Sequence, residues 1–239
     1  MNIETFASRL VETRDLSAWV RHFVFERVDQ KPMTFAPGQW FNLFLPHEGQ
    51  ELRRPYSIAS HPDGSARFEL TVTRVPGGPG SEALHAMPLG TEVRTVGPHG
   101  LFIREADDPR PALFVGTGAG LAPLRSMLKA ALAAPSHPKM TLLFGVRSEA
   151  DILYRQEIES WAKERASIRV HVTLSRPDAD WTGKSGYVQQ HLDEAWNELA
   201  EPEAHVFICG LDKMVKDVRE RSKGELGVPR RHVHIERFD

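Results

Sequence analysis

Hydrophobic and polar residues alternate along the first part of the chain, which is the pattern of β-strands with one buried face. In the clearest case, Phe68, Leu70 and Val72 point one way and the residues between them point the other. Turn residues such as Pro37-Gly38 separate the runs. The strand-like runs are residues 19–28, 39–45, 54–60, 67–75 and 91–96, and a short helix capped by Ser81 is expected at 81–87. Short strands at this spacing predict a closed antiparallel β-barrel.

The periodicity changes after the polar, proline-bearing segment 107–111. Beyond it, strand-like runs alternate with helical patterns such as the face made by Leu121, Leu124 and Leu128. The expected strands are residues 112–115, 140–144, 168–174, 205–209 and 232–235. This alternation predicts an α/β architecture, with a parallel five-stranded sheet and helices on both faces. We therefore expect two domains, residues 1–106 and residues 107–239.

Composition narrows the possible partners and location. The chain has 239 residues, 41% of them hydrophobic and 26% charged, which is normal for a soluble globular protein. Its net charge of −2 gives no general attraction to nucleic acid or to an anionic membrane. No apolar run approaches the roughly 20 residues that span a bilayer, and the N-terminus lacks the pattern of a signal peptide. We expect a cytoplasmic monomer without nucleic-acid or membrane partners.

The sequence gives little indication of a metal site or a disulfide. The single cysteine, Cys209, excludes an internal disulfide and a cysteine-ligated zinc or iron–sulfur site within this chain. His232 and His234 share a strand face, but no third ligand has suitable spacing. No metal site is expected.

The run Arg54-Pro55-Tyr56-Ser57 combines three groups that suit a large planar cofactor. An arginine fork suits a diphosphate, a tyrosine face suits a flat ring system, and a serine hydroxyl can donate or accept beside such a ring. Alternation sends Arg54 and Tyr56 to one face of a strand. The alternative is an ordinary strand with an exposed arginine and a half-buried tyrosine.

The glycine run 116–120 follows the first strand of the second half and leads into a helix. Ligands of open α/β sheets bind at the carboxyl ends of the strands, and glycines let backbone N–H groups approach a diphosphate. The run is not a full G-x-G-x-x-G fingerprint, because Leu121 occupies the last position. Cys209-Gly210 should lie beside it, where the thiol could touch a bound dinucleotide. The alternatives are a plain tight turn and a buried free cysteine.

Polar groups also follow the second and third strands of the second half. Arg147 ends one strand, and Ser175-Arg176 ends the other. A serine and arginines at this edge could grip a terminal monophosphate, such as the ribose 2′-phosphate that separates NADP from NAD. The alternative is that both arginines are solvated surface residues.

Taken together, these motifs resemble the ferredoxin–NADP reductase superfamily over nearly the whole chain. The matching elements, in the family's order, are Pro37-Gly38-Gln39, Arg54-Pro55-Tyr56-Ser57, Gly78-Pro79-Gly80-Ser81, Gly97-Pro98-His99-Gly100, Gly116-Thr117-Gly118-Ala119-Gly120-Leu121-Ala122-Pro123, Ser175-Arg176, Cys209-Gly210 and Glu236-Arg237-Phe238. The resemblance implies an N-terminal FAD-binding barrel, 1–106, and a C-terminal NADP(H)-binding domain, 107–239. It also implies hydride transfer across the cleft between them.

The resemblance also implies roles for the residues of the flavin half. Arg54, in its run with Pro55, would contact the FAD pyrophosphate, Tyr56 would stack on the isoalloxazine, and Ser57 would hydrogen-bond near flavin N5. The other residues implied in FAD binding are Thr71, Val72 and Thr73 along the flavin and ribityl chain, and Gly80 and Ser81 at the pyrophosphate. Phe238 would either cover the flavin face that nicotinamide must reach or pack into the core, and Asp239 follows it.

In the nucleotide half, the resemblance places NADP(H) on the glycine run. The residues implied there are Gly116, Thr117, Gly118 and Pro123 on the dinucleotide, Arg147, Ser175 and Arg176 on the 2′-phosphate, Tyr187 on the adenine, and Cys209, Gly210 and Leu211 toward the nicotinamide. Glu236 would sit close by. Ser57, Cys209 and Glu236 would then be nearest the reacting atoms.

The implied reaction moves hydride between NADP(H) and FAD, and single electrons between FAD and a separate acceptor such as ferredoxin or flavodoxin. Arg53, Arg125, Arg230 and Arg231 are candidates for recruiting an acidic ferredoxin, or else are scattered solubilising charge. One alternative is an NADH-using reductase component of an oxygenase, or a free flavin reductase. Another is a non-catalytic flavin- or nucleotide-binding regulatory module.

Overall fold

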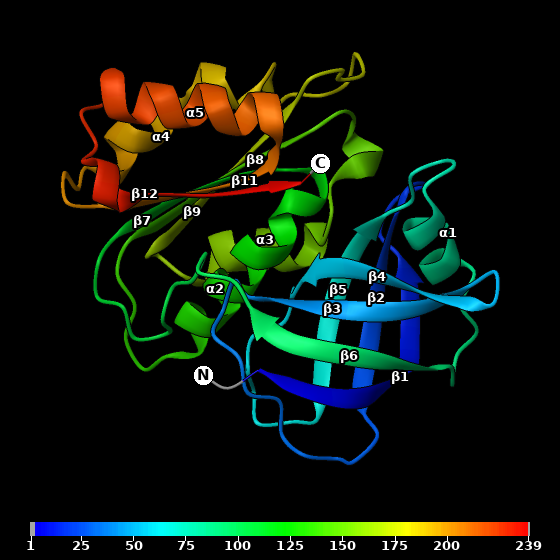
Figure 1. Cartoon of the computed structure of the whole chain (residues 1–239). Helices are drawn as coiled ribbons and strands as arrows, with labels where there is room; N and C mark the ends of the chain where they lie inside the picture. The colour runs from blue at the N-terminus through cyan, green and yellow to red at the C-terminus, as the bar shows by residue number, and fades with distance from the viewer. Residues whose placement is uncertain (1–2, 239) are drawn as a thin grey trace. The chain divides into compact units, whose positions relative to one another are not determined.

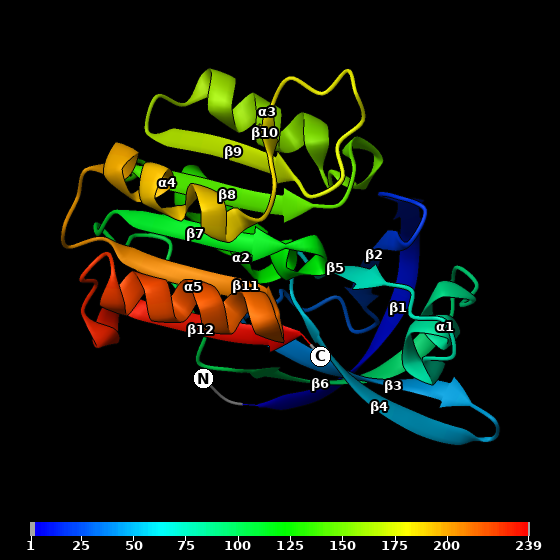
Figure 2. The same cartoon turned by 90° about the horizontal axis from the view of Figure 1, so that it is seen from above.

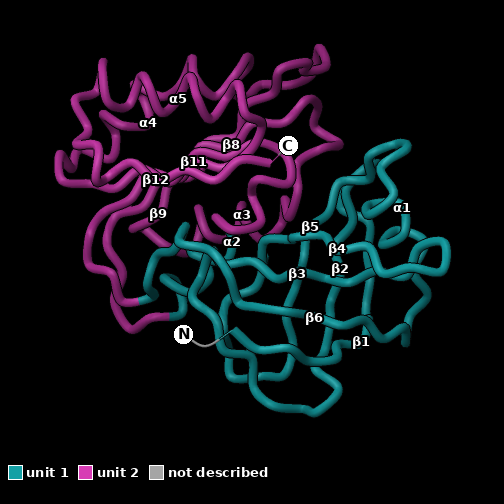
Figure 3. The backbone as a smooth tube through the Cα atoms, viewed as in Figure 1, with its two compact units in different colours: residues 1–106, 125–133 teal, residues 107–124, 134–239 magenta. Residues whose placement is uncertain are grey.

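A computed structural model describes residues 3–238, and these residues form two compact units (Figure 3). Unit 1 takes in residues 1–106 and 125–133, and unit 2 takes in residues 107–124 and 134–239. Helix α2 (Leu121–Ala133) therefore begins in unit 2 and ends in unit 1. Within the described residues, no helix is long and apolar enough to cross a membrane.

Unit 1 is built on an antiparallel sheet of six strands, one more than the alternation predicted, because no strand was expected over residues 4–15. The strands are β1 (Glu4–Asp15), β2 (Val20–Arg27), β3 (Trp40–His47), β4 (Gln50–Ser57), β5 (Arg67–Thr73) and β6 (Glu92–His99). They lie in the order β4-β3-β6-β1-β2-β5 (Figure 1). The two edges meet where Ile58 bridges Leu70, and the N–H of Ala59 donates to the carbonyl of Glu69 at 2.8 Å. The sheet therefore curls into a barrel.

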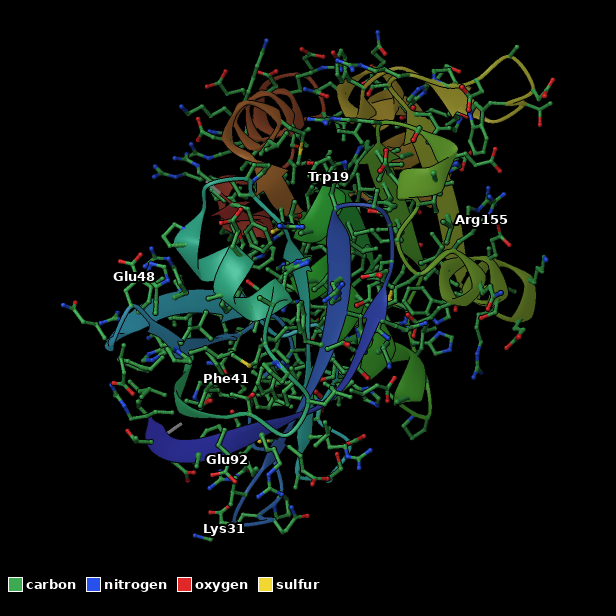
Figure 4. The ribbon with its side chains drawn as sticks, turned by 90° about the vertical axis from the view of Figure 1, so that its right-hand side faces the viewer. Trp19, Lys31, Phe41, Glu48, Glu92 and Arg155 are labelled. Carbon is green, nitrogen blue, oxygen red and sulfur yellow. The ribbon has the colours of Figure 1, made fainter. Side chains whose placement is uncertain are left out.

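The barrel interior is filled by apolar side chains from its strands. The fully buried core residues of these strands are Leu10, Phe23, Phe25, Phe41, Leu43, Leu45, Phe68 and Leu70. Phe41 and Phe68 meet edge to face with ring centroids 4.9 Å apart. Phe41 points inward, whereas Glu48 and Glu92 project outward (Figure 4). Apolar burial of this extent stabilises the barrel.

Helix α1 (Pro79–His85) lies on the barrel, and its start differs from the prediction. The N-cap is Gly78, not Ser81, because Pro79 occupies the first helical position. The proline ring fixes φ near its helical value, and proline has no backbone N–H that would require a hydrogen-bond acceptor there. Ser81 sits inside the first turn instead. Its hydroxyl accepts the N–H of Val75 at 3.0 Å and lies 3.1 Å from the carbonyl of Gly78, so it shapes the loop before the helix.

Unit 2 contains a parallel sheet of six strands, one more than predicted. The strands are β7 (Ala112–Thr117), β8 (Met140–Val146), β9 (Ile168–Leu174), β10 (Lys184–Ser185), β11 (His205–Leu211) and β12 (Val233–Phe238), in the order β10-β9-β8-β7-β11-β12. The additional strand, β10, has two polar residues and pairs only with Thr173 and Leu174. A strand this short has no alternation to detect, so five strands was an underestimate.

Helices cover both faces of this sheet, as predicted (Figure 2). The helices of unit 2 are α3 (Arg155–Glu164), α4 (Leu192–Leu199) and α5 (Asp212–Gly224), with short 3₁₀ turns at Gly118–Gly120, Glu149–Asp151, Val188–His191 and Arg230–His232. Helices α4 and α5 pack with Val115, Leu143 and Ile208 on one face. Helix α3 lies against β9 on the other. The chain leaves β7 for β8 and returns at β11, so the sheet order reverses between β7 and β11.

Candidate functional site

The carboxyl end of β4 carries the flavin motif. Arg54 pairs with Leu43, and Tyr56 pairs with Phe41, across the β3–β4 ladder. Arg54 and Tyr56 are half-buried, whereas Pro55 between them is exposed. Alternation along the strand thus places the arginine and the tyrosine on one side, as the sequence predicted.

Arg54 lies directly across Gly80, in the first turn of α1. A Cβ added to Gly80 would stand 2.6 Å from Cγ and 2.9 Å from Nε of Arg54. The guanidinium also donates from Nη1 to the carbonyl of Arg53 at 2.9 Å. Only glycine therefore lets Arg54 cross the helix start. The arrangement unites a fixed cation with the backbone of a helix N-terminus, which is the chemistry that a diphosphate requires.

Tyr56 and Ser57 follow Arg54 on the strand. Tyr56 packs against the barrel core, and burial raises the pKa of its phenol to about 12, so the ring stays neutral. Ser57 is the last residue of β4 and pairs with Trp40. The structure therefore brings Arg54, Tyr56 and Ser57 to one strand end.

The predicted flavin residues of β5 divide between the two sides of the strand. The side chain of Val72 packs in the core, so only its backbone can face a ligand. Its carbonyl accepts a hydrogen bond from Nε2 of His85 at 3.0 Å, which ties α1 to β5. Thr71 is buried and Thr73 is half-buried on the opposite side. The side chains of Thr71 and Thr73 therefore lie on the side of β5 away from the barrel core, whereas the side chain of Val72 lies in the core.

Arg125 is a buried residue, contrary to its prediction as a surface cation that recruits an acidic partner. Its side chain is 4% exposed. It donates to the carboxylate of Glu69 and, at 2.8 Å, to the carbonyl of Ala59. Burial raises the pKa of the Glu69 carboxyl, but Arg125 and Lys129 lower it more, so the net shift is downward. The sequence signal was available, because Arg125 borders the apolar stripe made by Leu124 and Leu128.

The glycine run after β7 packs tightly against the end of β11. Gly116 pairs with Cys209 in the sheet. A Cβ on Gly120 would stand 2.4 Å from the carbonyl oxygen of Cys209, and Gly118 has a φ of +53°. The run therefore needs glycine for close backbone approach and for a left-handed residue. It meets Cys209-Gly210 as predicted.

Thr117 supplies an unpaired polar atom at this place. Its Oγ1 is buried and has no hydrogen-bond partner among the described residues. A Cβ on Gly210 would stand 2.3 Å from that oxygen. Buried hydroxyls are usually paired, so this one fits a ligand with a polar group. Pro123, in the first turn of α2, is buried.

Replacement of Gly120 by alanine should destabilise the protein. The added methyl would meet the backbone of Cys209, which no rotamer change can relieve. Overpacking of this kind costs about 1–3 kcal/mol in free energy of unfolding, measurable by urea denaturation. Gly224→Ala is the matched control, because an added Cβ there meets nothing within 4 Å at the end of α5. Equal stability of the two variants would contradict the tight contact.

Cys209 is 0% exposed, and its neighbours disfavour a thiolate. Burial, and then the charge of Glu236, raise the pKa of the thiol well above its usual range. Glu236 stands opposite Cys209 in the β11–β12 register, so the two predicted residues do lie together. Phe238 is half-buried and stands opposite Leu211, which is 67% exposed. Asp239 lies outside the described residues.

The native protein should resist thiol alkylation. The reactive species is the thiolate, and Cys209 is both buried and neutral. Iodoacetamide at neutral pH should leave the folded chain unmodified and add one label after denaturation in guanidinium, which mass spectrometry detects. Rapid labelling of the folded protein would show that this end of β11 opens.

The carboxyl ends of β8 and β9 bring together the residues predicted to bind a 2′-phosphate. The N–H of Arg176 donates to the carbonyl of Arg147 at 2.7 Å, and that of Ser175 donates to Val146 at 3.0 Å. Both arginines are exposed, and neither side chain makes an ion pair with any described residue. Tyr187, 67% exposed, follows Gly186, whose N–H donates to the carbonyl of Leu174 at 2.8 Å. The edge thus offers two free cations and an open aromatic ring.

The opposite end of this sheet holds a stack of histidines. Nδ1 of His205 lies 2.8 Å from Nε2 of His234, and the ring of His232 stacks on His205 at 4.4 Å. Burial lowers the pKa of His205 to about 4. Within residues 3–238, no three or more His, Cys, Asp or Glu side chains are arranged so that they could hold a metal ion. Arg230 and Arg231 are exposed at this amino end, away from the glycine run.

Two protein-family models match the two halves of the chain. One is described as an oxidoreductase FAD-binding domain and matches residues 7–103. The other is described as an oxidoreductase NAD-binding domain and matches residues 114–220. The first match includes the Arg54 motif, and the second includes the glycine run.

Known proteins resemble the chain over most of its length. It is 55% identical to ferredoxin--NADP reductase B of Sorangium cellulosum, over 99% of this chain and 98% of that one. It is 29% identical to the anthranilate 1,2-dioxygenase electron transfer component of Acinetobacter baylyi, over 87% of this chain but 59% of that one. The crystal structure of Amycolatopsis cytochrome P450 reductase GcoB matches 99% of this chain and 70% of its own, with a TM-score of 0.85 and 28% identity.

Proposed function

The chain belongs to the ferredoxin–NADP reductase superfamily, and on that basis we propose that it is an FAD-dependent ferredoxin (or flavodoxin)–NADP(H) reductase. The observation that carries the proposal is the 55% identity to a ferredoxin--NADP reductase along essentially the whole of both chains. We assign FAD binding to residues 1–106 and NADP(H) binding to residues 107–239.

In the FAD domain, each proposed contact rests on a feature of the barrel. Arg54, held across Gly80, neutralises the pyrophosphate, and the first turn of α1 offers backbone N–H groups to it. Tyr56 presents a neutral ring for stacking. Ser57 places a hydroxyl at the strand end, toward flavin N5. Ser81 acts indirectly, since its hydroxyl is used to fix the loop that precedes α1.

In the NADP(H) domain, the proposed contacts follow the switch point of the sheet. The backbone of Gly116–Gly118 receives the diphosphate, and the unpaired hydroxyl of Thr117 donates to it. Ser175, Arg176 and Arg147 grip the 2′-phosphate. Tyr187 stacks on the adenine. Pro123, being buried, contributes to the start of α2 and not to the ligand surface.

FAD supplies the chemistry when bound: it exchanges hydride with NADP(H) and single electrons with the acceptor protein. The residues of the chain orient and shield these groups. Ser57 donates a hydrogen bond near N5, and Cys209, a neutral thiol, presents a small surface to the nicotinamide. Glu236, Gly210 and Leu211 complete that surface. Phe238, at the end of β12, would be the aromatic side chain that shields the bound flavin.

Stopped-flow reduction tests this function. The purified protein, loaded with FAD, is mixed anaerobically with NADPH or NADH, and flavin absorbance is followed. Rapid bleaching by NADPH, followed by reoxidation with ferredoxin or flavodoxin, is the expected result. Equal or faster bleaching by NADH would overturn the assignment of Ser175 and Arg176. A yellow protein that neither coenzyme bleaches would indicate a binding module without catalysis.

An NADH-using reductase component of an oxygenase is the second candidate. The likeness to the Acinetobacter electron transfer component favours it, although the chain spans 59% of that protein. Reoxidation by an oxygenase component, but not by ferredoxin or flavodoxin, would support this candidate. The cytoplasmic location and the monomeric state stay predictions.

A further inference from the structure

Helix α2 carries both the turn proposed to hold NADP(H) and side chains that hold the flavin strand. It starts immediately after the glycine run. Its first turn is locked there, because a Cβ on Gly116 would stand 2.8 Å from Leu124 and Gly120 abuts Cys209. From Gly120 to Arg125 the helix rises only about 8 Å. The glycine run and Arg125 are therefore joined directly by one continuous helix.

The second turn of α2 binds the residues that follow the flavin motif. Arg125 donates to the carbonyl of Ala59 at 2.8 Å, and Ser126 donates to that of Ser60 at 2.5 Å. Both residues are buried, at 3% and 0% exposure. Ser60 is held from the other side too, because its hydroxyl accepts the N–H of Glu69 at 3.1 Å.

The hydrogen bonds from Arg125 and Ser126 satisfy backbone carbonyls that lie beyond the end of the β3–β4 pairing. The β3–β4 ladder stops at the pair Trp40–Ser57, and the chain then crosses to β5. The carbonyls of Ala59 and Ser60 thus depend on α2 for donors. A buried carbonyl left without a donor costs about 1–3 kcal/mol, so the crossing segment follows the helix. Ser57 precedes that segment by a single residue.

We propose that Arg125 and Ser126 are positioning residues that transmit occupancy of the glycine run, through α2, to Ser57 and the bound flavin. The inference rests on the proposed function, since it takes the glycine run as the coenzyme site and Ser57 as a flavin contact. We assign neither residue a contact with coenzyme or flavin. Their role is to make the flavin environment respond to the coenzyme before any hydride moves.

A coenzyme analogue without nicotinamide tests the inference. 2′-Phospho-ADP-ribose can occupy the glycine run but has no ring to lay on the flavin. Added to the FAD-loaded wild type, it should change the visible flavin spectrum and slow backbone hydrogen exchange at Ile58–Ser60. Ser126→Ala removes one hydrogen bond and no charge, and it should abolish both responses while binding the analogue.

Ser222→Ala is the matched control. Ser222 is equally buried in helix α5 and donates to the carbonyl of Val218 at 2.7 Å, far along the chain from the flavin motif. This variant should keep both responses. If Ser126→Ala does not fold, hydrogen exchange at Ile58–Ser60 of the wild type, measured with and without the analogue, still tests the inference.

The inference would be overturned if the analogue binds the wild type but changes neither the flavin spectrum nor the hydrogen exchange. It would also be overturned if Ser126→Ala responds as the wild type does. Reduction by NADPH would remain intact in either case, so the proposed function would stand. Failure of NADPH to reduce the flavin would overturn the proposed function itself.

Discussion

Arg54→Ala should fold and lose most of its affinity for FAD. A charge-assisted hydrogen bond is worth about 1.5–3 kcal/mol, which corresponds to a rise of about 10- to 150-fold in the dissociation constant. Arg54 lies against the first turn of α1, where a Cβ added to Gly80 would stand 2.6 Å from its Cγ. Fluorescence titration of the apoprotein with FAD measures the loss, and a melting curve shows that the barrel remains folded.

Gly80→Ala tests the same site without removing the charge. The new methyl would stand 2.6 Å from Cγ of Arg54, so the guanidinium must leave its position. FAD affinity should fall as it does in Arg54→Ala. Arg53→Ala is the matched control: Arg53 is exposed and donates from Nε to Asn42 at 3.1 Å, so its loss should leave FAD binding unchanged. Wild-type affinity in Arg54→Ala would refute the assignment of the pyrophosphate site.

The sequence predicted both sheets from periodicity, but it missed two strands for identifiable reasons. In β1, a bulge between Leu10 and Glu12 interrupts the alternation. An inward position of the same strand is polar, because Ser8 pairs with Thr95 at 2.6 Å inside the barrel. Strand β10 is too short to show any period. Alternation thus identifies strands whose buried positions are all apolar and whose register is unbroken.

The candidate site was predictable where its chemistry depends on short runs of residues. Arg54 and Tyr56 are two positions apart, and Gly116 and Thr117 are adjacent, so both motifs could be recognised in the sequence. Arg125 was misjudged because its role depends on Glu69, a residue distant along the chain, so its place beside the apolar stripe of α2 did not identify its partner. The pairing of Arg54 with Gly80 likewise emerges only from the fold.

Removal of the cations at the ends of β8 and β9 should change the coenzyme preference. Arg147 and Arg176 are exposed, adjacent through a backbone hydrogen bond of 2.7 Å, and have no ion-pair partner among the described residues. Each charge-assisted contact with a 2′-phosphate is worth about 1.5–3 kcal/mol. Arg176→Ala should therefore lower kcat/KM for NADPH by about tenfold or more, and should leave NADH, which lacks that phosphate, nearly unchanged.

The double variant sharpens this prediction, because the two arginines would bind one phosphate and their effects should not simply add. Steady-state reduction of an artificial electron acceptor with each coenzyme measures the ratio directly. Arg231→Ala is the matched control, since that arginine is equally exposed but lies at the amino end of the sheet. It should keep the wild-type preference. If Arg176→Ala lowers kcat/KM equally for NADPH and NADH, Arg176 supports the fold of this edge and does not bind the 2′-phosphate.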